Sequence, residues 1–362
     1  MRHAILILAV CALAAVTVLP GASAQTIPFK VIRTFPHPSS YANALTWAND
    51  TIWMSYSAGP LEQYDPYTGT RIKTYPTPNT KPRGLAFDGM DLWLASWYKA
   101  PTPSIFQINP VTGGVIQSYV APFTNGTSNG MAWDGATLWL TNEANSIYQI
   151  DTFRWVVLGS ISVPALGSYN PRDLAWDNRT HTLWAGYQSS GLIRKHNSLN
   201  GAVLEEFASP YGNFQQGLTW DSSCFLWATG GSTKLDVSQI DVTPPFMVLK
   251  GVLQGGTPIQ FELTDTTNEV GNLFLVGWSS SGTWPPIMIS GKPVPLALDS
   301  VTLLGLQLLP FFSMVIDTSN TATTPQFLWP KLPPAIPFWV CGVTLNSSGL
   351  VSVTEAQKYV TQ

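Results

Sequence analysis

The most regular feature of the chain is an apolar pattern that occurs in five copies. In each copy a polar residue opens an apolar strand, a turn led by Asp or Asn follows, and a second apolar strand carries a tryptophan. The copies read NALTWANDTIWMS, RGLAFDGMDLWLA, NGMAWDGATLWLT, RDLAWDNRTHTLWAG and QGLTWDSSCFLWAT. They begin at Asn43, Arg83, Asn129, Arg172 and Gln216, with spacings of 40, 46, 43 and 44 residues.

A repeat of this length, built from short strands and tight turns, is the signature of a β-propeller whose blades are four-stranded antiparallel sheets. The strand pair of each copy supplies the two inner strands of a blade. A third strand follows in segments such as SIFQINPVTG, and fourth strands end at Pro78, Pro122, Pro164 and Pro210. Proline is tolerated in an outer strand because the missing backbone donor costs least there.

The fifth copy has no fourth strand of its own, because the chain runs from its third strand into TPPF. A matching strand, VIRTFPHP, precedes the first copy and ends at Pro38. We expect this N-terminal strand to complete the last blade, which joins the two ends of the ring and removes an open edge. The predicted fold is therefore all-β, with a five-bladed propeller over residues 26–243.

Residues 244–362 lack the repeat. Runs such as PIQFEL, NLFLVGW and PFWVCGVTL are separated by Gly, Pro and Ser, which predicts a small C-terminal β-sandwich domain. The joining segment DVTPPF contains two prolines, so we expect a short and stiff connection between the two domains.

The N-terminus has the pattern of a signal peptide over residues 1–24. Arg2 and His3 precede a long apolar run, and Ala22, Ser23 and Ala24 form the small-residue cleavage site. The mature chain is expected to start at Gln25 and to be secreted, either extracellular or periplasmic. The most apolar later run, VTLLGLQLLPFFSMVI, is interrupted by Gln and Pro, so no membrane insertion is predicted.

Composition narrows the partners. Charged residues are 11% of the chain and the net charge is −3, so neither nucleic acid nor an anionic membrane surface is an electrostatically natural partner. A monomer is expected. Beyond the signal peptide the chain has two cysteines, Cys224 and Cys341. They could pair as a disulfide after export or remain two separate thiols, and both alternatives stay open.

Residues that could carry catalysis are scarce. The repeated Asp88, Asp134, Asp177 and Asp221 stand in the first hairpin turn, where an aspartate normally caps its own backbone. Asp173 and Glu143 are the acids expected toward the opposite end of the blades. The sequence has no Ser-His-Asp order, no spacing typical of metal ligands and no phosphate loop, so we predict no catalytic residue, no metal and no cofactor.

The candidate site lies where the first strands begin and the blades converge. Its polar residues are Asn43, Arg83, Asn129, Arg172 and Gln216. One interpretation is a polar lining for a water-filled channel. The other is a ligand site, in which amides and arginines donate hydrogen bonds, aromatic side chains stack, and an acid lies nearby. The expected stacking residues are Tyr56, Trp97, Tyr98 or Tyr187, and the expected acid is Glu143.

Amides and aromatics together suit a glycan or a peptide, and two arginines favour a carboxylate on that ligand. The phrase GLAWDG…LW followed by I-x-x-I-[DN]-P-x-T-G resembles the repeat of streptogramin-lyase-like and other bacterial YVTN-type propellers over residues 31–243. The segment FQQGLTWDSSCFLWATGGS resembles a blade of the five-bladed glutamine cyclotransferases. Both resemblances imply a propeller fold.

The catalytic residues of these families do not carry over. The lyase-like enzymes are seven-bladed and use a His-centred site, whereas His37, His181 and His196 are expected on an outer strand, a turn and a third strand. The acidic residue of the cyclotransferase stretch is replaced by Ala228. The leading hypothesis is a secreted, non-catalytic binding propeller. The alternatives are a lyase- or cyclotransferase-like enzyme with a divergent site, and a scaffold that displays the C-terminal domain.

Overall fold

The structure is a computed structural model of the whole chain. The predicted signal peptide lies outside the described residues, apart from its last position. The described residues are 24–37, 41–57, 59–78, 81–98, 101–102, 104–124, 126–166, 171–188, 190–231, 234–243, 246–251, 258–264, 273–279, 287–289, 292–294, 313–316, 322–324, 327–328, 337–346, 349–354 and 356–360.

The repeat copies fold into antiparallel sheets, each with the first strand of its copy at one edge. The first two sheets consist of β3 (Ala42–Ala48), β4 (Thr51–Tyr56), β5 (Leu61–Tyr64) and β6 (Arg71–Tyr75), and of β7 (Pro82–Phe87), β8 (Leu92–Ser96), β9 (Ile105–Ile108) and β10 (Val115–Tyr119). The next two consist of β11 (Ser128–Trp133), β12 (Leu138–Asn142), β13 (Ser146–Asp151) and β14 (Val156–Ser162), and of β15 (Pro171–Asp177), β16 (Thr182–Tyr187), β17 (Leu192–Asn197) and β18 (Val203–Ala208).

The last copy contributes three strands to its sheet, and the fourth comes from the N-terminus. After the short 3-10 helix η1 (Gly212–Phe214) come β19 (Gln215–Trp220), β20 (Leu226–Gly230) and β21 (Asp236–Asp241). The strand β2 (Lys30–Pro36) pairs antiparallel with β21, from Lys30 opposite Asp241 to Pro36 opposite Asp236. The strand pairing expected from the sequence is therefore present, although Pro38 itself lies outside the described residues.

A second N-terminal segment covers another sheet edge. Strand β1 (Gln25–Thr26) lies parallel to β18, with Gln25 opposite Glu205 and Thr26 opposite Glu206. The backbone N–H of Ile27 continues this pairing and donates to the carbonyl of Glu206 at 3.0 Å. The sequence pattern gave no sign of β1, because a two-residue strand carries no periodicity.

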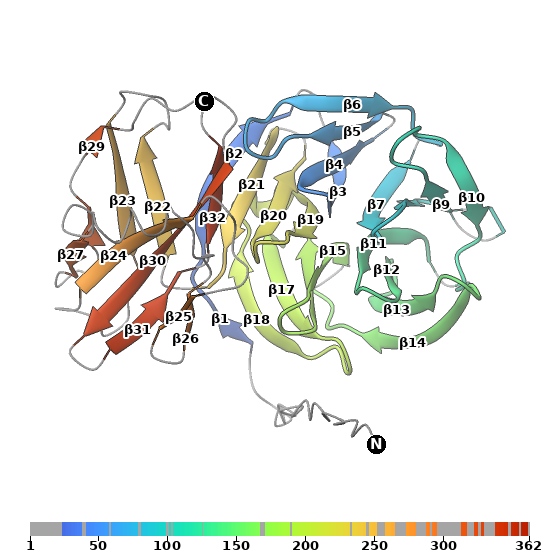
Figure 1. Cartoon of the computed structure of the whole chain (residues 1–362). Coiled ribbons are helices and arrows are strands. Elements are labelled where there is room, and N and C mark those ends of the chain that lie inside the picture. The colour runs from blue at the N-terminus through green and yellow to red at the C-terminus, as the bar shows by residue number, and fades with distance from the viewer. Residues whose placement is uncertain are drawn as a thin grey trace, which may run out of the picture.

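The inner strands form a closed ring. Strand β3 contacts β7, β7 contacts β11, β11 contacts β15, β15 contacts β19, and β19 contacts β3 again. Figure 1 shows the sheets radiating from this centre, with β6, β10, β14 and β18 on the outside. Sheets arranged radially around one axis are the defining feature of a β-propeller, and the repeated part of the chain has this fold.

Stacked indoles separate neighbouring sheets. Trp176 on β15 stacks on Trp139 of the preceding sheet, with ring centroids 6.0 Å apart. Trp220 stacks on Trp184 in the same way at 6.4 Å, and Trp47 stacks on a tryptophan of β20 at 6.0 Å. The tryptophans of the repeat therefore fill the space between sheets, where large flat side chains bury much apolar area.

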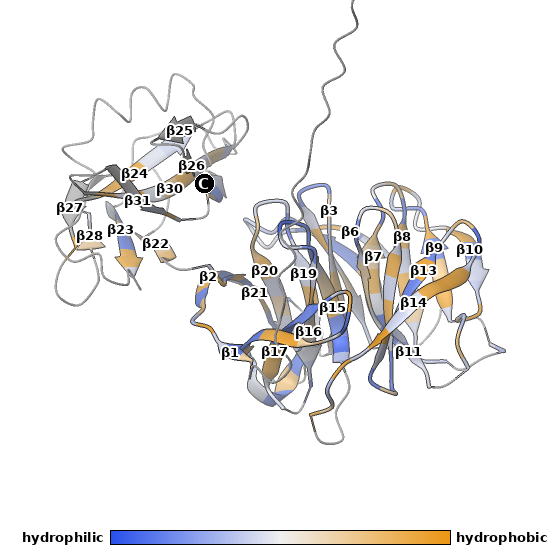
Figure 2. Ribbon diagram, turned by 90° about the horizontal axis from the view of Figure 1, so that it is seen from below, coloured by the Kyte–Doolittle hydropathy of each residue, from blue (hydrophilic) through white to orange (hydrophobic). Residues whose placement is uncertain are grey.

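The outer strands of the second and third sheets are exposed and apolar. On β10 the side chains of Val115 and Ile116 are exposed, and on β14 those of Val156 and Leu158 are exposed. Figure 2 shows apolar colouring along β14. By contrast, the outer strand β6 carries the charged side chains of Arg71 and Lys73. Charged side chains on an edge strand disfavour pairing with a strand of another chain.

The C-terminal part forms two further sheets and a two-stranded pair. One sheet pairs β22 (Phe246–Gly251), β23 (Pro258–Thr264), β28 (Ala322–Thr323) and β29 (Phe327–Leu328). The other contains β24 (Leu273–Ser279), β27 (Ser313–Val315), β30 (Pro337–Asn346), β31 (Gly349–Val353) and β32 (Gln357–Val360), while β25 (Ile287–Ile289) pairs with β26 (Lys292–Val294). One buried cluster holds Phe261 of the first sheet together with Phe274 and Val340 of the second.

The last strand of the chain contacts the strand that closes the ring. Arg33 on β2 donates to the backbone carbonyl of Lys358 on β32 at 2.7 Å. The Arg33 guanidinium lies 5.0 Å from the ring centroids of both Tyr67 and Tyr359. Lys358 also pairs with Asp50 at 2.9 Å. This cluster of cations and tyrosines ties the C-terminal part to the seam of the propeller.

Candidate functional site

The five predicted polar residues occupy one equivalent position. Each is the second residue of its inner strand, and each lies at a shift in register between the first and second strands of its sheet. A β-bulge of this kind redirects a side chain locally. We call this end of the ring the polar mouth, defined by Asn43, Arg83, Asn129, Arg172 and Gln216.

The amides at the polar mouth are engaged in packing between strands. Asn43, Asn129 and Gln216 are all buried. Asn43 donates through Nδ2 to the carbonyl of Pro82 at 2.7 Å, and Arg172 donates through Nε to Oε1 of Gln216 at 3.3 Å. These amides therefore offer little surface to a ligand, which corrects the expectation of an open ring of amide donors.

One acceptor among these amides lacks a partner. Oδ1 of Asn129 is buried and makes no hydrogen bond in the described part of the chain. Asn129 also lies beside the next inner strand, since a Cβ on Gly84 would come within 2.3 Å of its backbone carbonyl. Glycine at this position allows the two inner strands to approach closely.

Three of the predicted site residues do converge. The Arg83 guanidinium lies 5.2 Å from the ring centroid of Trp97, and Nζ of Lys81 lies 5.0 Å from the same centroid. Nε1 of Trp97 donates to Oε1 of Glu143 at 2.6 Å. Trp97 directly follows β8 and Glu143 directly follows β12, so neighbouring sheets contribute to one cluster. We call Lys81, Arg83, Trp97 and Glu143 the arginine cluster.

The arginine cluster combines opposite charges and remains partly open to solvent. Burial lowers the pKa of Arg83, and the nearby carboxylate of Glu143 opposes that decrease. In the described part of the chain the Arg83 guanidinium makes no hydrogen bond or ion pair. Trp97 remains 36% exposed. The cluster therefore presents a cation with unused donors beside an accessible indole.

Tyr56 and Tyr187 are wrongly placed by the sequence reasoning, because both side chains are fully buried. The Tyr56 hydroxyl lies 3.1 Å from that of Tyr64, and burial raises the pKa of Tyr56. The Tyr187 hydroxyl lies 3.0 Å from Nε2 of His196. Neither ring can stack on a ligand, since both fill space between neighbouring sheets.

Asp173 closes the axis of the ring beneath the polar mouth. Its side chain is fully buried and accepts backbone N–H groups from four residues. The donors are Leu45 at 3.4 Å, Met131 at 3.3 Å, Leu174 at 2.9 Å and Leu218 at 2.9 Å, which lie on four different inner strands. Burial raises the pKa of Asp173, and the four amides act against that increase.

Asp173 takes space that glycine leaves elsewhere. The equivalent positions in the other inner strands are Ala44, Gly84, Gly130 and Gly217. A Cβ on Gly130 would lie 2.3 Å from Cα of Asp173, so the small residue is required for the close approach. One carboxylate thereby serves four strands, and it is enclosed by protein instead of being open to a substrate.

The repeated turn aspartates have the structural role expected of them. Oδ1 of Asp88 accepts the N–H groups of Met90 and Asp91 at 2.8 and 2.7 Å. Its other oxygen accepts Nε1 of Trp93 at 2.8 Å. Asp134 and Asp221 repeat both bonds, with Trp139 and Trp227 as donors. The Trp-Asp pattern is therefore a turn coupled to an inter-sheet spacer.

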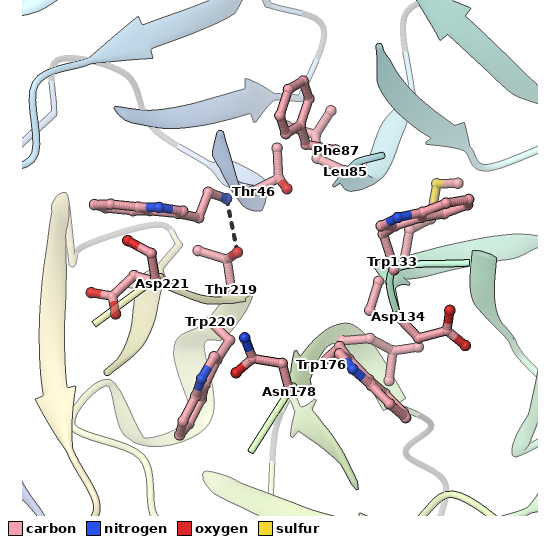
Figure 3. A pocket seen from close by; sticks show the side chains of 16 residues that line it. Thr46, Leu85, Phe87, Trp133, Asp134, Trp176, Asn178, Thr219, Trp220 and Asp221 are labelled. Carbon is pink, nitrogen blue, oxygen red and sulfur yellow. Dashed lines mark hydrogen bonds between the residues drawn. The ribbon is translucent and has the colours of Figure 1, made fainter. Parts of the chain in front are cut away.

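The sequence analysis missed a cavity at the other end of the axis. This end, the hairpin mouth, is where the first hairpin turns of Asp88, Asp134, Asp177 and Asp221 lie. The cavity has a volume of about 290 Å³. Its wall includes one aromatic residue from each inner strand, at the same position of each repeat copy: Trp47, Phe87, Trp133, Trp176 and Trp220. Figure 3 shows Phe87, Trp133, Trp176 and Trp220 around the cavity. The shared aromatic position was the available signal.

Three further features concern the cysteines, possible metal ligands and possible membrane helices. Cys224 and Cys341 are thiols and form no disulfide with each other. Within the residues that the structure describes, no three His, Cys, Asp or Glu side chains gather closely enough to hold a metal ion. A search of the same residues found no helix long and apolar enough to cross a membrane.

No protein-family model matches the chain, and no curated protein matches its sequence. Among solved structures, the glutaminyl cyclase of Myxococcus xanthus aligns with a TM-score of 0.52 at 15% identity, covering 60% of this chain and 98% of the cyclase. The Cps50 (Swd1) β-propeller domain of Myceliophteria thermophila aligns at 0.41 and 10% identity, covering 60% and 100%. The WD40 β-propeller domain of Doa1 aligns at 0.38 and 12% identity, covering 55% and 63%. The likeness to the cyclase speaks for the fold alone.

Proposed function

We propose that this chain is a secreted, non-catalytic binding protein that holds a glycan or a peptide at the polar mouth of a five-bladed propeller. The observation that carries the proposal is the arginine cluster, in which Arg83, Trp97 and Glu143 meet from separate strands. The repeat phrase supports a propeller of the streptogramin-lyase-like, YVTN type. The closed order of the inner strands supports the count of five blades.

The domain organisation follows from the same features. We assign residues 26–243 to the propeller and residues 244–362 to a β-sandwich. The shared buried cluster of Phe261, Phe274 and Val340 supports the sandwich, since two sheets that pack face to face bury one common core. The predicted signal peptide supports export, and the low content of charged residues argues against nucleic-acid or anionic-membrane partners. We take the protein to be a monomer.

The chemistry of the arginine cluster favours a ligand that carries a carboxylate. A guanidinium binds a carboxylate through two parallel N–H donors, and Arg83 has its donors unused in the described structure. Trp97 offers an exposed indole beside it, on which a sugar ring or a peptide side chain could stack. Acidic glycans and peptides with acidic residues or a free C-terminus both meet these requirements.

A binding role explains the acids better than catalysis does. A cyclotransferase-like reaction needs a carboxylate that can reach the substrate and exchange a proton with it. Asp173 is enclosed by four backbone amides, and Glu143 accepts the indole N–H of Trp97. An enzyme with a divergent site is the alternative, and it requires one of these two acids to be released.

An array of glycans and peptides probed with the mature chain tests the proposal. We expect the bound members to share a carboxylate, and we expect their methyl esters to lose binding, because esterification removes the charge that Arg83 recognises. Ligands that bind equally well as esters, or an array without any carboxylate-bearing hit, would refute the assignment. Turnover of a bound member would favour the enzyme alternative.

A further inference from the structure

The cavity at the hairpin mouth differs in character from the polar mouth. Its lining includes residues in the middle of the inner strands and residues of the hairpin turns. The residues from the strand middles are Thr46, Leu85, Met131 and Leu174. Asp173 lies on the inner side of these residues, where it binds the amides of neighbouring inner strands. A ligand in the cavity is therefore separated from the arginine cluster by a buried layer of protein.

The aromatic side chains form the wall of the cavity without closing it. In Figure 3 the rings of Trp133, Trp176 and Trp220 point away from the centre. Trp176 and Trp220 each stack on an indole of the preceding sheet, which fixes their positions. The space in the middle is thus bounded by rigid ring edges and backbone, and such a preformed wall costs little to order on binding.

A few polar groups remain available to a ligand. In Figure 3 the Thr46 hydroxyl faces the middle of the cavity. Neither Thr46 nor Asn178 makes a side-chain hydrogen bond in the described part of the chain, and Asn178 is exposed at the rim. The Thr219 oxygen accepts the backbone N–H of Trp47 at 2.8 Å, and its own proton is left to donate.

The cavity has no feature that would hold a charged ligand. Its lining contains no Lys, Arg or His. Its two acids, Asp134 and Asp221, are already engaged by turn N–H groups and by indole N–H groups. The cation beside this mouth, Arg179, lies 5.2 Å from the ring centroid of Trp220 and is already paired with Asp177 at 3.7 Å. A cationic ligand would have to displace the existing hydrogen bonds of the two acids. An uncharged ligand with several hydroxyl groups fits this lining best.

The volume limits the size of that ligand. About 290 Å³ corresponds to roughly ten water molecules at about 30 Å³ each. This is close to the lower end of known ligand pockets, which begin at about 300 Å³. We infer that the cavity at the hairpin mouth is a second binding site, for one neutral sugar unit. The hydroxyl groups of the sugar would form hydrogen bonds with the side chains of Thr46, Thr219 and Asn178, and its C–H groups would pack against the aromatic wall.

The test titrates the mature chain with the methyl glycosides of glucose, galactose, mannose and N-acetylglucosamine, followed by calorimetry and tryptophan fluorescence. We expect at least one to bind with a Kd of about 1 mM or tighter. The double variant Thr46→Val, Asn178→Ala should weaken that binding at least tenfold. Both substitutions leave the sheets intact, because neither side chain is hydrogen-bonded and one of them is exposed.

The controls separate this site from the polar mouth. Arg83→Met should leave the binding of the neutral glycoside unchanged, and glucuronic acid should bind the cavity more weakly than glucose. No binding of any of the four glycosides at about 50 mM would overturn the inference and leave the cavity as a water-filled vestibule. Binding that survives the Thr46 and Asn178 double variant, or that Arg83→Met abolishes, would overturn it as well.

Discussion

At the scale of single residues, the most consequential side chain is one that the repeat pattern does not contain. Four inner strands have a glycine or an alanine where the fifth has Asp173. The sequence predicted that Asp173 lies toward the polar-mouth end of the blades, but it did not predict the partners of the carboxylate. Those partners are backbone N–H groups from separate blades, and no local pattern reports how strands far apart in the chain meet.

Asp173→Asn should destabilise the propeller. The amide nitrogen cannot accept a hydrogen bond, so two of the four backbone N–H groups lose their acceptor inside the protein. We expect a loss of about 1–3 kcal/mol in the free energy of unfolding. Denaturant unfolding of the variant and of Asp50→Asn measures this difference. Asp50 is largely exposed, and loss of its surface ion pair with Lys358 should cost at most about 1 kcal/mol. Equal losses in the two variants would show that Asp173 is not a central acceptor.

His196 should make stability depend on pH. Burial lowers its pKa from 6.5 to about 4. The neutral ring donates from Nδ1 to the carbonyl of Gly201 at 3.0 Å, so Nε2 accepts from the hydroxyl of Tyr187. Between these pKa values the unfolded chain binds the proton and the folded chain does not. Stability therefore falls as pH decreases from 6.5 toward 4, by up to about 3 kcal/mol.

The contribution of His196 is measured by comparing unfolding curves of the parent and of His196→Gln over this pH range. We expect the variant to lose less stability than the parent on acidification, because glutamine does not titrate. His181→Gln, at an exposed turn, serves as the matched control and should behave as the parent does. Parallel pH profiles for all three proteins would contradict the prediction.

At the scale of strands and sheets, the sequence predicted well wherever the repeat is strong. The paired inner strands, their turn aspartates and the closing strand all follow from alternation and turn chemistry, because these are local signals. The reasoning failed where the same residue types serve two purposes. Tyr56 and Tyr187 end second strands, as an aromatic at a channel mouth would, yet their side chains are buried between neighbouring sheets.

The closing strand β2 offers a direct test at this scale. A variant lacking residues 26–38 loses the whole ladder between β2 and β21 and exposes the outer edge of the last sheet. We expect aggregation or a large loss of thermal stability, since an uncovered edge recruits other chains. Size-exclusion chromatography and thermal unfolding measure both effects. A variant that stays monomeric and melts as the parent does would mean that β2 is dispensable for closure.

At the scale of the whole molecule, two features connect parts that are distant in the sequence. Arg33, Tyr67 and Tyr359 join the seam of the propeller to the last strand of the C-terminal part. Asp173 separates the arginine cluster at one end of the axis from the aromatic cavity at the other. The two ends of the axis therefore differ in chemistry: one has the arginine cluster, and the other has a cavity lined mainly by aromatic side chains.

The most direct measurement of the proposed function is the affinity of the best carboxylate-bearing array ligand for the double variant Arg83→Met, Arg172→Met. The two arginines are the only full charges among the five residues that define the polar mouth, and a hydrogen bond to a charged group contributes about 1.5–3 kcal/mol. Arg154→Met, at an exposed turn between β13 and β14, serves as the control. We predict that the double variant folds normally and binds more than tenfold more weakly, while the control binds as the parent does. Unchanged affinity in the double variant would contradict a ligand site at the polar mouth.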